Sequence, residues 1–177
     1  MTTKNYNIED VSPVIWVHEN KFVNEKGEFL TFKEHSFLFD IYRDMSQEIV
    51  LKKAAQVGVS VTMVLKAIHI AKTYGMTVIY TLPSDDDVSE FVPTKVDKII
   101  QSNPEIVKLL GKDNVELKEI GNRFIHFKGT RSKTAPIMTT ADLLIHDEID
   151  RSEKGIIDQY SSRISRSQYK GIWRLSN

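Results

Sequence analysis

The chain of 177 residues contains no cysteine, which excludes disulfide bonds and thiolate metal sites. No apolar run approaches the ~20 residues of a membrane-spanning helix, and the first residues lack the apolar core of a signal peptide. Excess charge is also absent, because 24 Lys and Arg residues balance 24 Asp and Glu residues. A protein that binds nucleic acid through bulk charge would be more basic. We therefore expect an intracellular protein that contacts nucleic acid, if at all, through a local patch.

The pattern that is present alternates strands with helices. Hydrophobic residues make up 41% of the chain and charged residues 27%, a composition that fits one folded domain of this length. Strands are predicted at residues 48–53, 76–81, 143–147 and 172–175. Helices are predicted at 59–73, at 85–110 with breaks near two prolines, and at 156–165. This order predicts a three-layer α/β domain around a mainly parallel sheet.

Three further segments are predicted, the first of them at the periphery. Residues 12–32 alternate loosely around a turn at 24–27, which predicts an N-terminal hairpin. Residues 35–45 have helical spacing, and residues 115–128 predict a second hairpin around Gly121-Asn122. We therefore divide the single domain, 1–177, into an N-terminal hairpin and helix (1–47) and a core (48–177).

The stretch Leu51-Lys-Lys-Ala-Ala-Gln-Val-Gly-Val-Ser60 lies between a predicted strand and a predicted helix, as a phosphate-binding loop does. In the pattern G-x-x-x-x-G-K-[ST], Gly58 takes the second glycine and Ser60 the serine or threonine. Val59 stands where the pattern has lysine, whereas Lys53 stands at the first glycine. The loop therefore has its lysine at an unusual place.

The displaced lysine can still serve a nucleotide. Lys53 can fold back across the loop mouth towards the β- and γ-phosphates, whereas Lys52 points to the opposite face of the strand. Backbone N–H groups at the helix start can form an anion-binding nest, and the Ser60 hydroxyl can bind Mg²⁺. The residues expected to contact the nucleotide are Lys53, Ala54, Ala55, Gln56, Val57, Gly58, Val59, Ser60 and Val61. An ordinary strand–turn–helix with surface lysines is the alternative.

A second motif, Leu143-Leu-Ile-His-Asp-Glu148, is an apolar strand that ends in two acids. Parallel strands deliver their carboxyl ends to the edge of the sheet where ligands bind. We expect Asp147 to hold Mg²⁺, directly or through water, and Glu148 to orient and deprotonate the attacking water. A strand that merely ends in solvated acids is the alternative, but the order of the two motifs favours an ATPase.

Together these residues resemble the large terminase subunits of tailed bacteriophages, in particular the lambda-like family. The resemblance rests first on Lys53–Ser60, with a lysine at the loop start and none before the serine. Phe32–Tyr42, Thr81–Ser84 and Asp147–Asp150 agree in order. The resemblance implies a P-loop NTPase fold of the ASCE, RecA-like class and an ATPase that drives DNA into empty capsids.

The resemblance also implies roles for residues outside the two motifs. Ser176 and Asn177 look like the start of the family's third motif, which couples hydrolysis to movement. Base-binding residues precede the loop in the family, so Tyr42 is a candidate to stack on adenine, with a core aromatic as the alternative. The family often has an arginine shortly before the acidic strand, but residues 138–139 are not arginine. Arg131 is the nearest candidate for an arginine finger.

The implied ligands are ATP as substrate and Mg²⁺. The implied partners are double-stranded DNA, a portal protein and a small terminase subunit, with the subunits in a ring on the procapsid in the host cytoplasm and no membrane. We expect the isolated domain to be a monomer. The apolar strand at 172–175 ends without a closing helix, so we expect a longer parent protein whose C-terminal nuclease domain is absent here.

Two other functions fit the same motifs. One is another helicase-like nucleic-acid translocase with the same catalytic core. The other is a nucleotide-binding module that cannot hydrolyse, because Val59 replaces the usual lysine.

Overall fold

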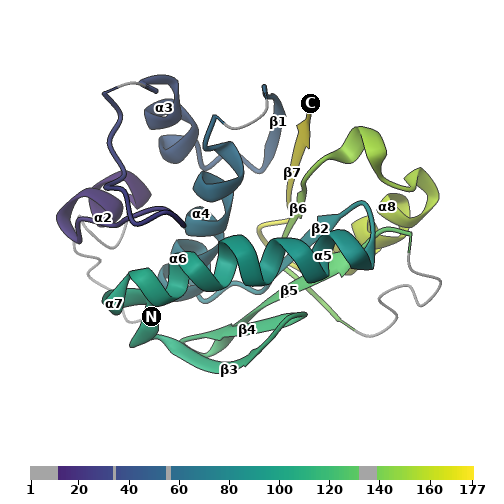
Figure 1. Cartoon of the computed structure of the whole chain (residues 1–177). Helices are drawn as coiled ribbons and strands as arrows, with labels where there is room; N and C mark the ends of the chain where they lie inside the picture. Colours follow the sequence, from purple (N-terminus) through teal and green to yellow (C-terminus); the bar gives the residue numbers. More distant parts are fainter. Residues whose placement is uncertain (1–11, 34, 55–56, 132–138) are drawn as a thin grey trace.

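The computed structural model describes residues 12–33, 35–54, 57–131 and 139–177. A sheet with the strand order β1-β7-β6-β2-β5-β4-β3 forms its centre (Figure 1). The strands are β1 (Glu48–Lys52), β2 (Val78–Leu82), β3 (Leu110–Asn114), β4 (Leu117–Ile120), β5 (Arg123–Gly129), β6 (Leu143–His146) and β7 (Gly171–Ser176). Strands β1, β7, β6, β2 and β5 are parallel to one another, whereas β4 pairs antiparallel with β5 and β3. The predicted mainly parallel sheet is confirmed.

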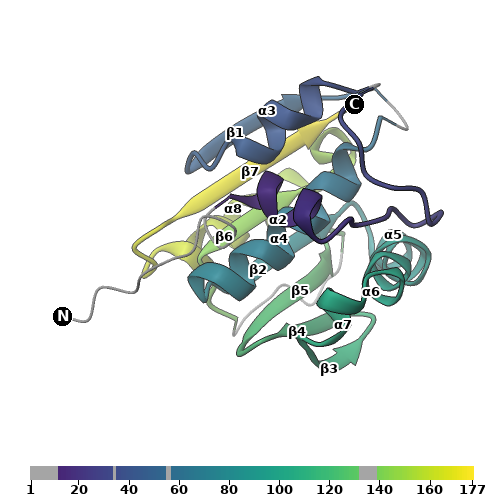
Figure 2. The same ribbon diagram turned by 90° about the vertical axis from the view of Figure 1, so that its left-hand side faces the viewer.

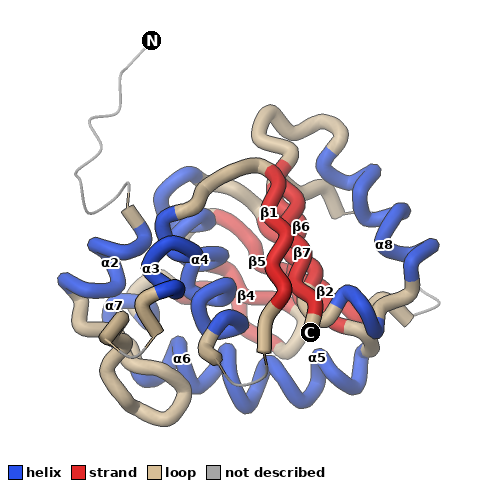
Figure 3. The backbone as a smooth tube through the Cα atoms, turned by 90° about the horizontal axis from the view of Figure 1, so that it is seen from above, coloured by secondary structure: helices blue, strands red, loops and turns tan. Residues whose placement is uncertain are grey.

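Helices cover both faces of this sheet. They are α2 (Pro13–Glu19), α3 (Phe37–Arg43), α4 (Val59–Tyr74), α5 (Asp85–Phe91), α6 (Asp97–Ser102), α7 (Pro104–Val107) and α8 (Lys154–Ser161). Helix α4 packs on one face in a core that also includes side chains of α5 and α6, and α8 packs on the other face. The view from above shows α8 on one side of the strands and α3 and α4 on the other (Figure 3). The three-layer α/β architecture is confirmed.

The central helix α4 is apolar on nearly all sides, which is typical of a buried helix. The sheet covers one side of α4, and α2 and α3 lie over another side of this helix (Figure 2). Gly58 and Gly75 bound it, both with left-handed backbone angles (φ 81° and 64°) that glycine adopts without a Cβ clash. The helix therefore begins at the end of the predicted phosphate loop.

The N-terminal segment corrects one prediction. Residues 13–19 form helix α2, so the prediction that the chain before the turn is a hairpin strand is wrong at these residues. The Ser12 hydroxyl accepts from the Ile15 N–H (3.5 Å) and Pro13 occupies the first turn, which are both helix-start signals. The turn at 24–27 is present, and Val23 and Phe29 form an isolated antiparallel bridge across it.

Two details of the segment 85–114 also differ from expectation. A π-helical turn, Val92–Val96, carries the chain from α5 into α6, so Pro93 does not break the helix. Residues 110–114 form strand β3 beside β4, where only the end of a helix was predicted. Within the described residues, no helix combines the length and apolar character needed to cross a membrane.

Candidate nucleotide-binding site

The sheet order brings the two sequence motifs together. Strands β1 and β6 are both parallel to β7, which lies between them, so their carboxyl ends share one edge. Lys53 follows β1 at this edge, and Asp147 follows β6. Ligands of α/β proteins bind at this edge of a parallel sheet.

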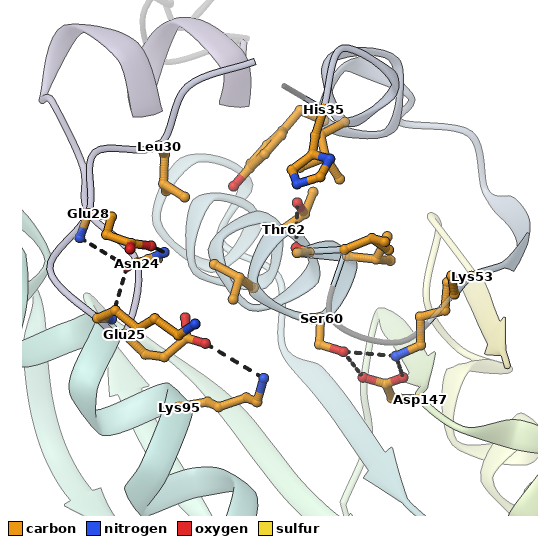
Figure 4. A pocket seen from close by; sticks show the side chains of 18 of the residues that line it. Asn24, Glu25, Glu28, Leu30, His35, Lys53, Ser60, Thr62, Lys95 and Asp147 are labelled. Carbon is orange, nitrogen blue, oxygen red and sulfur yellow. Dashed lines mark hydrogen bonds and ion pairs between the residues drawn. The ribbon is translucent and has the colours of Figure 1, made fainter. Parts of the chain in front are cut away.

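Three side chains from distant parts of the chain form a hydrogen-bonded cluster here (Figure 4). The Lys53 ammonium donates to Oδ1 of Asp147 (2.6 Å) and to Oγ of Ser60 (2.9 Å). The Ser60 hydroxyl donates to Oδ2 of Asp147 (2.8 Å). The Lys53 and Asp147 side chains are only 9% and 2% exposed. Lys52, by contrast, is exposed.

The described part of the loop explains how valine is tolerated at the usual lysine position. Val59 is 3% exposed and belongs to the apolar core, so it lies away from solvent. Gly58 has a left-handed backbone, and an added Cβ would lie 3.3 Å from Leu38. The first N–H groups of α4 have no acceptor within the helix and favour an anion. Ala54 and Val57 flank a gap, since Ala55 and Gln56 lie outside the described residues.

Asp147 has two further donors beyond the cluster. The Tyr80 hydroxyl from β2 donates to Oδ2 (2.7 Å), and the Glu148 N–H donates to Oδ1 (3.0 Å). Burial, and secondarily the Asp147 carboxylate, raises the pKa of Tyr80 well above its usual value of 10.0. Tyr80 is therefore a neutral donor. The sequence motifs did not reveal it, because only the pairing of β2 with β6 brings it here.

Glu148 lies beside the cluster in an unusual backbone conformation. Its φ of 54° is left-handed, which is uncommon for a residue with a Cβ and often marks a functional position. Its carboxylate accepts from the Arg151 guanidinium (2.5 Å). His146, one residue before Asp147, is buried against Tyr160 on the other face of the sheet. Burial lowers the pKa of His146 to about 4, so its imidazole is neutral at pH 7.

A cavity of about 730 Å³ adjoins the cluster, a size that fits a small-molecule ligand. Its wall extends from the phosphate loop to the N-terminal segment, and Tyr42 is part of it. The lining includes Lys53, Gly58, Val59, Ser60, Val61, Asp147, Glu148 and Asn177, and also Leu30, Phe32, His35 and Lys95. Tyr42 is only 2% exposed, and its ring packs edge-on against Phe32. Its stacking on adenine stays a prediction.

The other predicted residues lie close to the site. Asn177 lines the cavity, and its N–H donates to Asp150 (3.2 Å). Ser176 pairs with β1, and its carbonyl accepts from the Lys53 N–H (2.8 Å). Arg131 is exposed, and its guanidinium donates to the carbonyl of Arg151 (3.0 Å). Their roles in coupling and catalysis stay predictions.

The oxygen atoms of Ser60 and Asp147 fit a magnesium ion, which prefers oxygen ligands. The described residues contain no group of three or more His, Cys, Asp or Glu side chains placed to hold a metal. With only these two protein ligands, phosphate oxygens and waters would have to complete the coordination of a bound ion.

Comparisons with known proteins agree on one family. The family described as "Phage terminase large subunit gpA, ATPase domain" matches residues 39–163. No curated protein matches the chain. In fold the chain is similar to the HK97 bacteriophage large terminase, with a TM-score of 0.76 and 14% identity over 93% of this chain and 37% of that one.

Two further structures show the same fold. The large terminase ATPase domain of Thermus phage P74-26 has a TM-score of 0.58 and 14% identity, covering 78% of this chain and 62% of that one. The large terminase of a thermophilic bacteriophage in complex with ATP-γ-S has a TM-score of 0.54 and 10% identity, covering 82% and 35%. The family match itself spans from α3 to the region after α8 and includes the phosphate loop and both acids. The chain therefore belongs to the family of ATPase domains of phage terminase large subunits.

Proposed function

We propose that this chain hydrolyses ATP to drive double-stranded DNA into a viral procapsid. The observation that carries the proposal is the cluster of Lys53, Ser60 and Asp147 at the start of α4, with Glu148 beside it. The Lys53 ammonium already lies 2.9 Å from the Ser60 hydroxyl, so a positive charge reaches the loop although position 59 is valine. This favours turnover over a module that only binds nucleotide.

Each residue of the cluster has a role in the proposed reaction. The Lys53 ammonium exchanges its hydrogen bond to Asp147 for hydrogen bonds to the β- and γ-phosphate oxygens. Ser60 and Asp147 would hold Mg²⁺, which would supply positive charge against the phosphates. Water attacks the γ-phosphorus, the bond to the β,γ-bridging oxygen breaks, and the Glu148 carboxylate accepts the proton that the water loses.

Glu148 must leave Arg151 to act as this base. Arg151 Nη1 lies 2.5 Å from Oε2 of Glu148, and Arg151 Nη2 lies 3.7 Å from Oδ1 of Asp87 in α5. Asp87 therefore offers the guanidinium a second acceptor. The Arg151 and Glu148 side chains are 51% and 30% exposed. Ion pairs this exposed contribute little stability, so the pair can open at low cost.

The remaining parts of the proposal concern the whole motor. The chain spans 37% of the HK97 large terminase, which leaves room for the expected nuclease domain outside residues 1–177. We propose a ring of subunits on the procapsid that contacts a portal protein and a small terminase subunit in the host cytoplasm. Tyr42 would stack on adenine, Ser176 and Asn177 would couple hydrolysis to movement, and Arg131 would act as the arginine finger.

Separating the two acids tests the proposed reaction. Glu148→Gln should keep ATP binding and stop hydrolysis, because the amide keeps the shape but cannot accept the proton. Asp147→Asn should weaken nucleotide binding only when Mg²⁺ is present. Phosphate release measures hydrolysis, and titration of a fluorescent ATP analogue with Mg²⁺ or with EDTA measures binding.

Asp158→Asn is the matched control, since Asp158 is an exposed acid of α8, which packs on the other face of the sheet from α4. It should hydrolyse ATP nearly as fast as the unaltered chain. Near-normal turnover by Glu148→Gln would remove the base from the proposed reaction, and absence of turnover in every form of the chain would favour the binding module.

A further inference from the structure

Tyr80 lies in the middle of β2 and is fully buried, with 0% of its surface exposed. Its ring stacks on Phe91 of α5 and packs against Phe127 of β5, each with 5.6 Å between ring centroids. Its hydroxyl donates to Oδ2 of Asp147 over 2.7 Å. Two aromatic neighbours therefore hold the ring, and the ring directs its hydroxyl at one carboxylate oxygen.

The four donors to Asp147 differ in how they are held. A carboxylate has about four lone-pair sites, and here all four receive a hydrogen bond. Lys53 and Glu148 N–H donate to Oδ1 (2.6 and 3.0 Å), and Ser60 and Tyr80 donate to Oδ2 (2.8 and 2.7 Å). In the proposed reaction, Lys53 and Ser60 turn to the nucleotide and Mg²⁺. The backbone of Glu148 and the packed ring of Tyr80 have no such second task.

We propose that Tyr80 is a positioning residue, which keeps the Asp147 carboxylate oriented for Mg²⁺ after Lys53 and Ser60 have left it. The inference rests on the proposed function, because it requires Asp147 to be a metal ligand. Hydrogen bonds to a ligating carboxylate fix its orientation, and loss of such a partner typically costs about 10–100-fold in metal affinity or activity. A hydrogen bond to a charged acceptor is also stronger than a neutral one. Tyr80 contacts the metal ligand and not the reacting atoms.

A role in core packing alone makes a different prediction. Tyr80→Phe keeps the ring against Phe91 and Phe127 and removes only the hydroxyl. If the ring alone mattered, metal and nucleotide binding would not change. If the hydroxyl orients Asp147, metal binding weakens while binding of nucleotide without metal does not.

The experiment measures the two affinities separately on the whole chain. Mn²⁺ serves as the probe ion, because its electron paramagnetic resonance signal reports the free ion. The chain is kept in excess over ADP, and a titration of ADP without the chain corrects for Mn²⁺ that ADP binds in solution. A fluorescent ADP analogue in EDTA reports nucleotide binding without metal. For Tyr80→Phe we expect the Mn²⁺ concentration at half-saturation to rise about 10-fold or more and the affinity in EDTA to stay within about twofold.

Tyr169→Phe is the matched control. Tyr169 lies just before the amino end of β7, at the opposite end of that strand from the site. Its hydroxyl donates to the Met45 carbonyl (2.9 Å). It therefore loses a tyrosine hydrogen bond without touching Asp147, and its Mn²⁺ affinity should not change. Thermal unfolding of both variants checks that the fold is kept.

A double variant supplies a second criterion. If Tyr80 acts through Asp147, then Tyr80→Phe should have no further effect on Mn²⁺ binding in a chain that already carries Asp147→Asn. Equal Mn²⁺ affinity of Tyr80→Phe and the unaltered chain, or fully additive effects of the two changes, would overturn the inference. If the unaltered chain bound ADP but Mn²⁺ did not join the complex, the proposed metal site would fail instead, and this inference with it.

Discussion

At the scale of single residues, strand geometry separates two adjacent lysines. Along β1 the buried Ile49 and half-buried Leu51 face the core, and Lys53 continues that face into the site. Lys52 belongs to the alternate, exposed face together with Val50. One position along the chain therefore decides which ammonium group reaches Ser60.

This arrangement predicts a large difference between two similar substitutions. Lys53→Ala should lower the rate of ATP hydrolysis by roughly 10²-fold or more, since removal of one group that stabilises transition-state charge typically costs that much. Lys52→Ala should stay near the rate of the unaltered chain. Steady-state phosphate release at saturating ATP measures both. Equal losses, or a larger loss from Lys52→Ala, would show that the loop has been placed in the wrong register.

At the scale of elements, a buried lysine joins three of them. Lys66 of α4 is 0% exposed, and its ammonium donates to the carbonyls of Ile41 (2.8 Å) and Asp44 at the end of α3. The same ammonium lies 4.1 Å from the centre of the Trp173 ring on β7. Helix α3 is thereby tied to the helix that follows the phosphate loop and to the strand that ends at the site.

The burial of Lys66 makes the free energy of unfolding rise with pH. Burial lowers the pKa of Lys66 from 10.5 to about 7, and the Asp44 charge opposes this. Between pH 7 and 10.5 the unfolded chain therefore holds more protons at this residue than the folded one. The free energy of unfolding should rise with pH in that range, by at most about 1.4 kcal/mol per pH unit from this group.

Urea denaturation of the unaltered chain and of Lys66→Met at pH 7, 8 and 9 isolates the effect. Other titrating groups are common to both chains, so the difference in unfolding free energy reports Lys66. We expect this difference to shift in favour of the unaltered chain as the pH rises. Parallel curves would mean that Lys66 keeps an ordinary pKa in the folded protein.

At the scale of the whole molecule, the question is whether one chain completes its own active site. Arg131 is exposed, and the side-chain hydrogen bond described for it goes to the carbonyl of Arg151. Ring motors commonly receive an arginine from a neighbouring subunit, which contributes about 10³-fold or more to the rate. Such an arginine would be placed only when chains assemble.

Mixing two inactive chains tests this directly. A chain with Arg131→Ala keeps its own Glu148, and a chain with Glu148→Gln keeps Arg131. If the arginine acts on a neighbour, the mixture should hydrolyse ATP faster than either variant alone, and the unaltered chain should gain activity more than linearly with its concentration. No recovery in the mixture, together with fast turnover independent of concentration, would place the arginine function within one chain.

Local features of this protein were predictable from its sequence. Helix α4, the strands of the core and the phosphate loop follow from spacing, glycine positions and apolar runs, which depend on neighbours along the chain. Helix α2 was also signalled locally, by Ser12 and Pro13, but the loose alternation that follows them led to the prediction of a strand. Its misassignment therefore reflects competing local patterns.

The assembly of the site was decided by tertiary structure. The insertion of β7 between β1 and β6 sets where Lys53 meets Asp147, although the two residues are 94 positions apart. The pairing of β2 with β6 brings in Tyr80. Glu148 has a left-handed backbone, and its carboxylate contacts Arg151. The sequence alone determined which residues are candidates for the chemistry, because residue type and spacing mark them. Only the folded sheet decided which of them touch, because the order of parallel strands depends on packing between distant segments.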